Sequence, residues 1–227
     1  MWKHLRLIGT TTLLALAATL VLAAQQPGVH PLSGRVYAGV MGYQGADWLD
    51  RAERDDEEAP DDAIKALMLK PGDVVADIGA GSGFMSVRMA KKVGSTGRVI
   101  AEDIQPEMIK LLQDRLKREK VTNVTPLLGT IDDPKLPPAA LDLELLVDVY
   151  HEFQRPQEML RQLRAGLKPG GRLVLLEYRK EDPTIPIRPE HKMSVDVAKL
   201  EVEAEGFKLT KVDEVLPRQH ILIFTKP

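Results

Sequence analysis

VVADIGAGSGFMS, residues 74–86, places three glycines within five positions directly after a hydrophobic run. The run has the length and composition of a buried strand, and Phe84 begins a segment with helical patterning. Open α/β sheets bind ligands at such strand-to-helix turns, beyond the carboxyl ends of their strands. Because glycine lets the backbone approach a ligand closely, we expect Gly79, Gly81 and Gly83 to belong to a binding site.

The spacing of these glycines is G-x-G-x-G, whereas dinucleotide-binding loops use G-x-G-x-x-G. The sixth position counted from Gly79 is Phe84, and Asp77 stands two residues before the first glycine. A carboxylate pointed into the loop would repel a pyrophosphate but suits a ligand that carries positive charge. The loop therefore favours a cationic ligand over a dinucleotide.

Strand and helix patterns alternate in short units along the rest of the chain. The expected strands are 73–79, 98–103, 123–129, 141–149 and 172–178, and the expected helices are 63–69, 84–93, 106–120, 156–167 and 194–205, with a turn at KPGG, residues 168–171. Such alternation predicts parallel strands joined by crossover helices, which is a doubly wound α/β sheet.

The end of the chain breaks this alternation. Two strand patterns, FKLTKVDEVL at 207–216 and HILIFTK at 220–226, are separated only by PRQ. Strands joined so tightly must be antiparallel neighbours. The sequence therefore predicts a Rossmann-like, mostly parallel seven-stranded sheet with an antiparallel last strand.

Four segments, in this order, resemble the motifs of the class I S-adenosylmethionine-dependent methyltransferases. They are VVADIGAGSG (74–83), VIAEDIQPEMI (99–109), LLVDVYHEF (145–153) and LKPGGRLVLLEY (167–178). The resemblance covers roughly residues 63–227, and the reversed final strand agrees with it.

The resemblance implies a cofactor site for S-adenosylmethionine, with roles carried over residue by residue. The glycine loop would hold the methionine part of the cofactor, Asp103 the ribose hydroxyls, and LLGTIDDP (127–134) the adenine. Asp103 has Glu102 as a neighbour with which it can be confused, and LLGTIDDP departs from the commonest wording of that motif. The cofactor-binding residues implied in this way are Asp77, Gly79, Gly81, Gly83, Asp103, Thr130, Ile131, Asp132 and Asp148.

Methyl transfer needs alignment of nucleophile, methyl and sulfur more than it needs a fixed catalytic triad. A general base is required only where the nucleophile arrives protonated. VDVYHEF offers His151, whose ordinary pKa suits a base near neutrality, and Tyr150; the alternative is that His151 only caps or packs at the strand end. Glu177 ranks lower, and His191 and His220 are interpreted as structural or surface residues.

No metal site is expected, because no second histidine lies at helical spacing from His151. The chain has no cysteine, which excludes thiolate metal sites, disulfides and cysteine nucleophiles. Its net charge of -2 and the lack of a basic stripe disfavour nucleic acid. We therefore expect a small-molecule acceptor, methylated by in-line displacement, with variable segments 27–62 and 179–192 around it.

The N-terminus has the layout of a secretory signal peptide or a retained membrane anchor. Lys3 and Arg6 precede an apolar stretch that ends in small residues. Residues 1–26 are therefore treated as separate from the folded domain. If the segment is retained, residues 7–24 would attach the protein to the membrane. Either reading places the protein outside the cytoplasm or on the membrane, whereas a start at Met41 would make it cytoplasmic. An exported chain would meet little cofactor, so the alternative function is a non-catalytic binding module on the same scaffold.

Residues 27–62 form the third expected unit, an irregular arm rich in acidic and aromatic residues. The acidic run from Asp50 to Asp62 is interpreted as a solvated face or linker. Tyr37, Tyr43 and Trp48 fit instead a lid that faces the substrate.

Overall fold

The structure is a computed structural model, and it describes residues 28–227. The expected signal peptide or anchor, residues 1–26 with its apolar part 7–24, lies outside the described residues. Within residues 28–227, no helix combines the length and apolar character that crossing a membrane requires.

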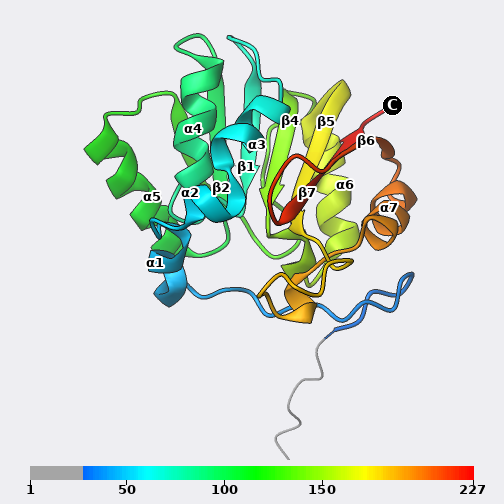
Figure 1. The fold of residues 1–227 in the computed structure, drawn as a ribbon. Helices are drawn as coiled ribbons and strands as arrows, with labels where there is room; N and C mark the ends of the chain where they lie inside the picture. The colour runs from blue at the N-terminus through cyan, green and yellow to red at the C-terminus, as the bar shows by residue number, and fades with distance from the viewer. Residues whose placement is uncertain (1–27) are drawn as a thin grey trace, which may run out of the picture.

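A single seven-stranded sheet in the order β3-β2-β1-β4-β5-β7-β6 forms the centre of the described chain (Figure 1). The strands are β1 Val74–Ile78, β2 Arg98–Asp103, β3 Val124–Leu128, β4 Leu141–Val147, β5 Leu167–Tyr178, β6 Lys208–Asp213 and β7 Gln219–Thr225. The first five strands pair in parallel, and β7 runs antiparallel to both β5 and β6. The expected fold class is therefore confirmed, including the reversed last strand.

Helices cover both faces of this sheet and bury two apolar clusters against it (Figure 1). The helices are α1 Ala46–Leu49, α2 Arg54–Glu58, α3 Pro60–Ala66, α4 Phe84–Val93, α5 Pro106–Glu119, α6 Pro156–Gly166 and α7 Val195–Ala204. Residues of α3, α4 and α5 pack in one cluster, and residues of α6 and α7 in the other. Side chains of the central strands β1, β2, β4, β5 and β7 contribute to both clusters, as expected of strands buried on both faces.

The KPGG segment is not a turn between helix and strand, as the sequence predicted. β5 already begins at Leu167, which pairs with Leu141, and the register then jumps to Arg172 opposite Leu143. Four residues of β5, 168–171, thus lie opposite the single residue Asp142 of β4, so the glycines form an irregularity inside the strand. Gly170 takes a φ of +77°, which glycine tolerates and other residues rarely adopt.

The described part of the arm, residues 28–62, is more ordered than the sequence indicated. It holds a 3₁₀ turn at Tyr43–Gly45, then α1 and α2, and α3 begins at Pro60, inside the expected arm. Proline at the first helical position explains this start. The acidic run is also only partly a solvated face, because Glu58 is 3% exposed. Its carboxylate accepts hydrogen bonds from Arg51, Arg54 and the Tyr178 hydroxyl.

Candidate active site

A cavity of about 560 Å³ lies beyond the carboxyl ends of the parallel strands. The turns after β1, β2 and β4 form its floor, at the point where the strand order reverses between β1 and β4. The arm and the segment 179–192 close the remaining sides. Among the residues that line the cavity are Met41, Trp48, Gly79, Gly81, Glu102, Asp103, Gln105, Ile131, Asp148, His151, Glu152 and His191.

Gly79 and Gly81 of the glycine loop line this cavity. Both have positive φ, +66° and +54°, which other residues adopt only under strain. A Cβ added to Gly79 would lie 2.6 Å from the Val149 side chain. Gly83 is different: it precedes α4 at a φ of +85° and packs against Leu112 of α5, so its role is close helix packing.

Asp77 lies beneath the loop and is absent from the cavity wall. It is 3% exposed, and the Ser86 hydroxyl donates a hydrogen bond to its carboxylate. Burial raises the pKa of Asp77 to about 6. Asp77 therefore ties the end of β1 to α4 and shapes the loop from below.

Two neighbouring carboxylates border the cavity at the end of β2. Asp103 accepts hydrogen bonds from the amides of Gly81 and Gln105, each at 2.9 Å, so it clamps the glycine loop. Glu102 accepts a long bond from the Gly79 amide at 3.4 Å, and its other oxygen is buried without a partner among the described residues. Burial, followed by the charge of Asp103, raises the pKa of Glu102 to about 8.

The adenine segment is brought to the cavity only through Ile131. Thr130 and Asp132 instead build a turn, in which the Thr130 hydroxyl donates to Asp132 and accepts from the Asp133 amide. These two residues are thus not placed where the sequence expected them. Local hydrogen bonding of this kind is typical of threonine and aspartate in loops.

Asp148 borders the cavity at the end of β4 with a positive φ of +55°. One carboxylate oxygen accepts from Gln219 at 2.7 Å, and the other is buried with no partner in the described part of the chain. Burial, then the nearby Glu58 and Glu177, raises its pKa well above the ordinary value. A buried acceptor without a partner beside a cavity suits a donor on a ligand.

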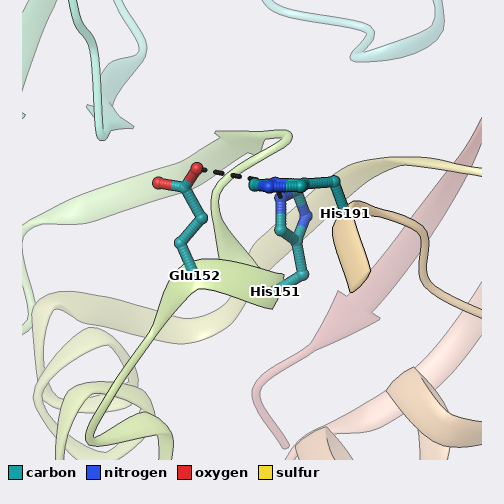
Figure 2. Close-up of side chains that lie close together, drawn as sticks. All are labelled: His151, Glu152 and His191. Atoms are coloured by element: carbon teal, nitrogen blue, oxygen red, sulfur yellow. Dashed lines mark hydrogen bonds and ion pairs between the residues drawn. The ribbon is translucent and has the colours of Figure 1, made fainter. Parts of the chain in front are cut away.

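His151 lines the cavity, and a buried carboxylate holds its ring. Its Nδ1 lies 2.6 Å from Glu177 and its Nε2 lies 3.1 Å from Nδ1 of His191. Burial lowers the pKa of His151, but the Glu177 carboxylate outweighs it, and the net shift is upward. Figure 2 shows His151, Glu152 and His191 gathered at one point.

Tyr150 does not reach the cavity, although the sequence offered it as a catalytic residue. Its ring is fully buried, and its hydroxyl donates to Glu201 at 2.8 Å on α7. Tyr150 and His151 are consecutive in a 3₁₀ turn, where neighbouring side chains diverge by about a third of a revolution. Tyr150 accordingly points toward α7, whereas His151 reaches the cavity wall.

The arm reaches the cavity through Met41 and Trp48, as a substrate-facing lid would. An ion pair between Arg35 and Glu201, at 2.8 Å and almost fully buried, holds the arm on α7. The Met41 amide donates a hydrogen bond to Glu152. The Gln105 side chain accepts a hydrogen bond from the Tyr43 amide and donates one to the Met41 carbonyl. Sequence reasoning missed Gln105, and it interpreted His191 as a structural or surface residue. The structure places His191 beside His151, 40 residues away in the chain.

The donor and acceptor set agrees with S-adenosylmethionine. Glu102 and Asp103 supply carboxylate oxygens for hydroxyl groups, and Ile104, Met108 and Ile131 supply apolar contacts for a flat ring beside them. Asp148 supplies an acceptor for an amino group, and glycine backbone lies between these positions. The residues present therefore fit the cofactor that the sequence motifs imply.

Comparison with known proteins gives the same assignment. The family described as "Methyltransferase domain" matches residues 69–216. A SAM-dependent methyltransferase from Aquifex aeolicus superposes with a TM-score of 0.78 at 26% identity, over 83% of this chain and 100% of that one.

Curated relatives match a smaller part of the chain. The ubiquinone/menaquinone biosynthesis C-methyltransferase UbiE of Hydrogenovibrio crunogenus is 33% identical over 119 residues, which are 52% of this chain and 47% of that protein. The chain thus spans about half the length of the curated relatives it matches. On its family match, its fold and the residues of its cavity, the chain belongs to the methyltransferase domain family, as a class I S-adenosylmethionine-dependent methyltransferase.

Proposed function

We propose that the protein transfers the methyl group of S-adenosylmethionine to a small, mostly apolar acceptor by in-line displacement. The observation that carries this proposal is the continuity of one cavity. The same cavity is lined by the glycine loop and Asp103, which would hold the cofactor, and by His151, Met41 and Trp48, which would meet the acceptor. A bound cofactor supplies an activated methyl group on its sulfonium.

The protein contributes position and exclusion of water. Met41 and Trp48 from the arm, and Pro186, Ile187 and Arg188 from segment 179–192, border the cavity opposite the sheet. Holding two reactants in one geometry removes much of the entropic barrier to their reaction. We infer that these segments orient the acceptor against the cofactor.

His151 is the proposed proton acceptor for a hydroxyl or acidic carbon on the acceptor. A proton on Nδ1 is held by Glu177, which leaves Nε2 able to accept a proton. General-base assistance of this kind contributes about 10²–10⁴-fold in rate.

A hydroxylated ring is the acceptor class that we infer. The apolar side chains of Met41, Trp48 and Phe153 suit a ring, and His151 suits its hydroxyl. The relative from Hydrogenovibrio crunogenus is named as a C-methyltransferase of ubiquinone and menaquinone biosynthesis, which supports a ring of the quinol type.

The test is methyl transfer by the full chain from isotope-labelled S-adenosylmethionine to a panel of hydroxylated aromatics and quinols. Trp48→Ala should raise KM for the acceptor and leave the cofactor Kd unchanged. Tyr43→Ala is a matched control, because Tyr43 is as exposed as Trp48, 40% against 41%, and lies outside the cavity wall. A protein that binds the cofactor but methylates no member of the panel would contradict the acceptor class.

A further inference from the structure

Two histidines and a glutamate converge at the cavity wall from different parts of the fold. One nitrogen of each histidine and one oxygen of Glu152 all lie within 4.8 Å of one another. His151 and Glu152 come from the 3₁₀ turn Tyr150–Glu152 after β4, and His191 comes from the 3₁₀ turn Pro189–His191 (Figure 2). The hydrogen bond between His151 and His191 accounts for the proximity of the two rings, but not for that of the Glu152 carboxylate.

The spacing of these atoms matches the ligands of one small cation. Nε2 of His151 lies 3.1 Å from Nδ1 of His191, which lies 3.9 Å from Oε1 of Glu152. Nitrogen and oxygen ligands about 2.0–2.2 Å from a tetrahedral zinc ion stand roughly 3.4 Å apart. The two observed separations lie on either side of that value, so small rotations of the side chains would complete the set.

Hydrogen bonds from neighbouring groups hold the side chains of His151 and Glu152 in position, as is typical of metal ligands. Glu177 takes the other ring nitrogen of His151 at 2.6 Å, and a carboxylate in this position fixes the tautomer and raises the basicity of a metal-bound imidazole. Glu177 is itself held by the Tyr150 amide at 3.0 Å. The Met41 amide donates to both oxygens of Glu152, at 3.2 and 3.3 Å, and so fixes the second ligand.

We propose that His151, Glu152 and His191 bind a divalent transition-metal ion, of which Zn²⁺ is the type. Two imidazoles with one carboxylate favour such an ion over Mg²⁺ or Ca²⁺, which prefer oxygen ligands. All three residues line the cavity, so the remaining coordination position opens toward the acceptor. Three protein ligands with one open position are typical of catalytic zinc rather than structural zinc.

This site goes beyond the proposed methyl transfer. While Nε2 of His151 holds a metal ion it cannot take a proton, and the ion itself then lowers the pKa of a hydroxyl that enters the open position. Metal binding requires neither cofactor nor acceptor, so it succeeds or fails separately from the proposed function.

The experiment is a calorimetric titration of Zn²⁺ into the full chain after treatment with a chelator. The expected result is one ion per chain for the wild type. His191→Ala and Glu152→Gln should each weaken binding by at least about 10-fold, and Glu177→Gln by about 10–100-fold. Glu190→Gln is the matched control, since this exposed neighbour of His191 lies outside the cluster.

A second readout reports the ligands directly. Co²⁺ added to the wild type should give the intense visible ligand-field absorption of a four-coordinate site, and His191→Ala should lose it. Thermal unfolding of each variant checks that it is folded, and His191 is partly exposed on its loop, so its replacement is suited to this test. Zn²⁺ binding that is absent in the wild type, or equal in the wild type and in folded His191→Ala, would overturn the proposal.

Discussion

The Nδ1 atom of His151 lies 2.6 Å from a carboxylate oxygen of Glu177, and both side chains are buried at the ends of adjacent strands β4 and β5. This contact fixes the ring so that Nε2 points toward Nδ1 of His191, 3.1 Å away at the cavity wall. Glu177 lies near the end of strand β5, and His151 lies in the 3₁₀ turn after β4, so the pairing of these two strands brings the side chains together. The two residues therefore act as one unit.

Replacing Glu177 with Gln should separate the electrostatic role of this carboxylate from its shape. Loss of the negative charge lowers the pKa of His151, since Glu177 is what holds it above the ordinary value. The ring's NMR titration should move to lower pH, and kcat should fall by about 10²–10⁴-fold if His151 is the base, while KM for the cofactor stays constant. An unchanged kcat in metal-free protein would exclude His151 as the base.

Gly79→Ala should destabilise the protein and weaken cofactor binding together. The positive φ costs about 1–2 kcal/mol for alanine, and the added Cβ meets Val149. Gly170→Ala is the control: its φ of +77° is similar, but a Cβ there has nothing within 4 Å, and β5 begins at the far end from the cavity. Denaturant unfolding and calorimetry of both variants make the comparison. Equal loss of affinity in the two would contradict the role of Gly79.

Arg35→Met should release the arm. It leaves the Glu201 carboxylate buried without its cation, which typically costs about 3–5 kcal/mol of stability. Because the arm carries Met41 and Trp48, KM for the acceptor should rise more than the cofactor Kd. The double variant Arg35→Met with Glu201→Leu should regain much of the stability; a double variant as unstable as the single one would show that the ion pair is not the cause.

The same ion pair predicts a pH dependence of unfolding. Burial raises the pKa of Glu201, but the hydrogen bond and charge of Arg35 outweigh it and hold the pKa below 4.5. A carboxyl group with a lowered pKa in the folded state stabilises the protein above the unfolded pKa, and this stability is lost as pH falls through the folded value. The wild type should therefore lose stability below pH 4.5 more steeply than the double variant, as followed by denaturant midpoints.

Sequence pattern predicted the sheet well because each strand and helix carries its own local signal. The glycine loop is an example. Gly79 and Gly81 have positive φ values, which glycine adopts readily, and the glycine spacing in the sequence indicated this loop. The KPGG irregularity in β5 was misread, because a Pro-Gly-Gly run has the same local chemistry in a turn and in a bulge.

The site was less predictable wherever distant segments meet. His191 stands beside His151 only because segment 179–192 returns to the turn Tyr150–Glu152, which no rule of sequence spacing reports. The arm is fixed by Arg35 and Glu201, 166 residues apart. Tyr150 was misplaced for the opposite reason: it is adjacent to His151 in sequence but turns toward Glu201.

The most direct measurement is calorimetric binding of S-adenosylhomocysteine to the full chain, with Asp103→Ala and Asp132→Ala as paired variants. Asp103 borders the cavity and clamps the Gly81 amide, whereas Asp132 belongs to a turn outside it. The account predicts that Asp103→Ala weakens binding by about 10–100-fold, as expected for loss of a hydrogen bond to a charged group, and that Asp132→Ala binds like the wild type. A folded wild type that does not bind, or an Asp103→Ala variant that binds as tightly as the wild type, would contradict it.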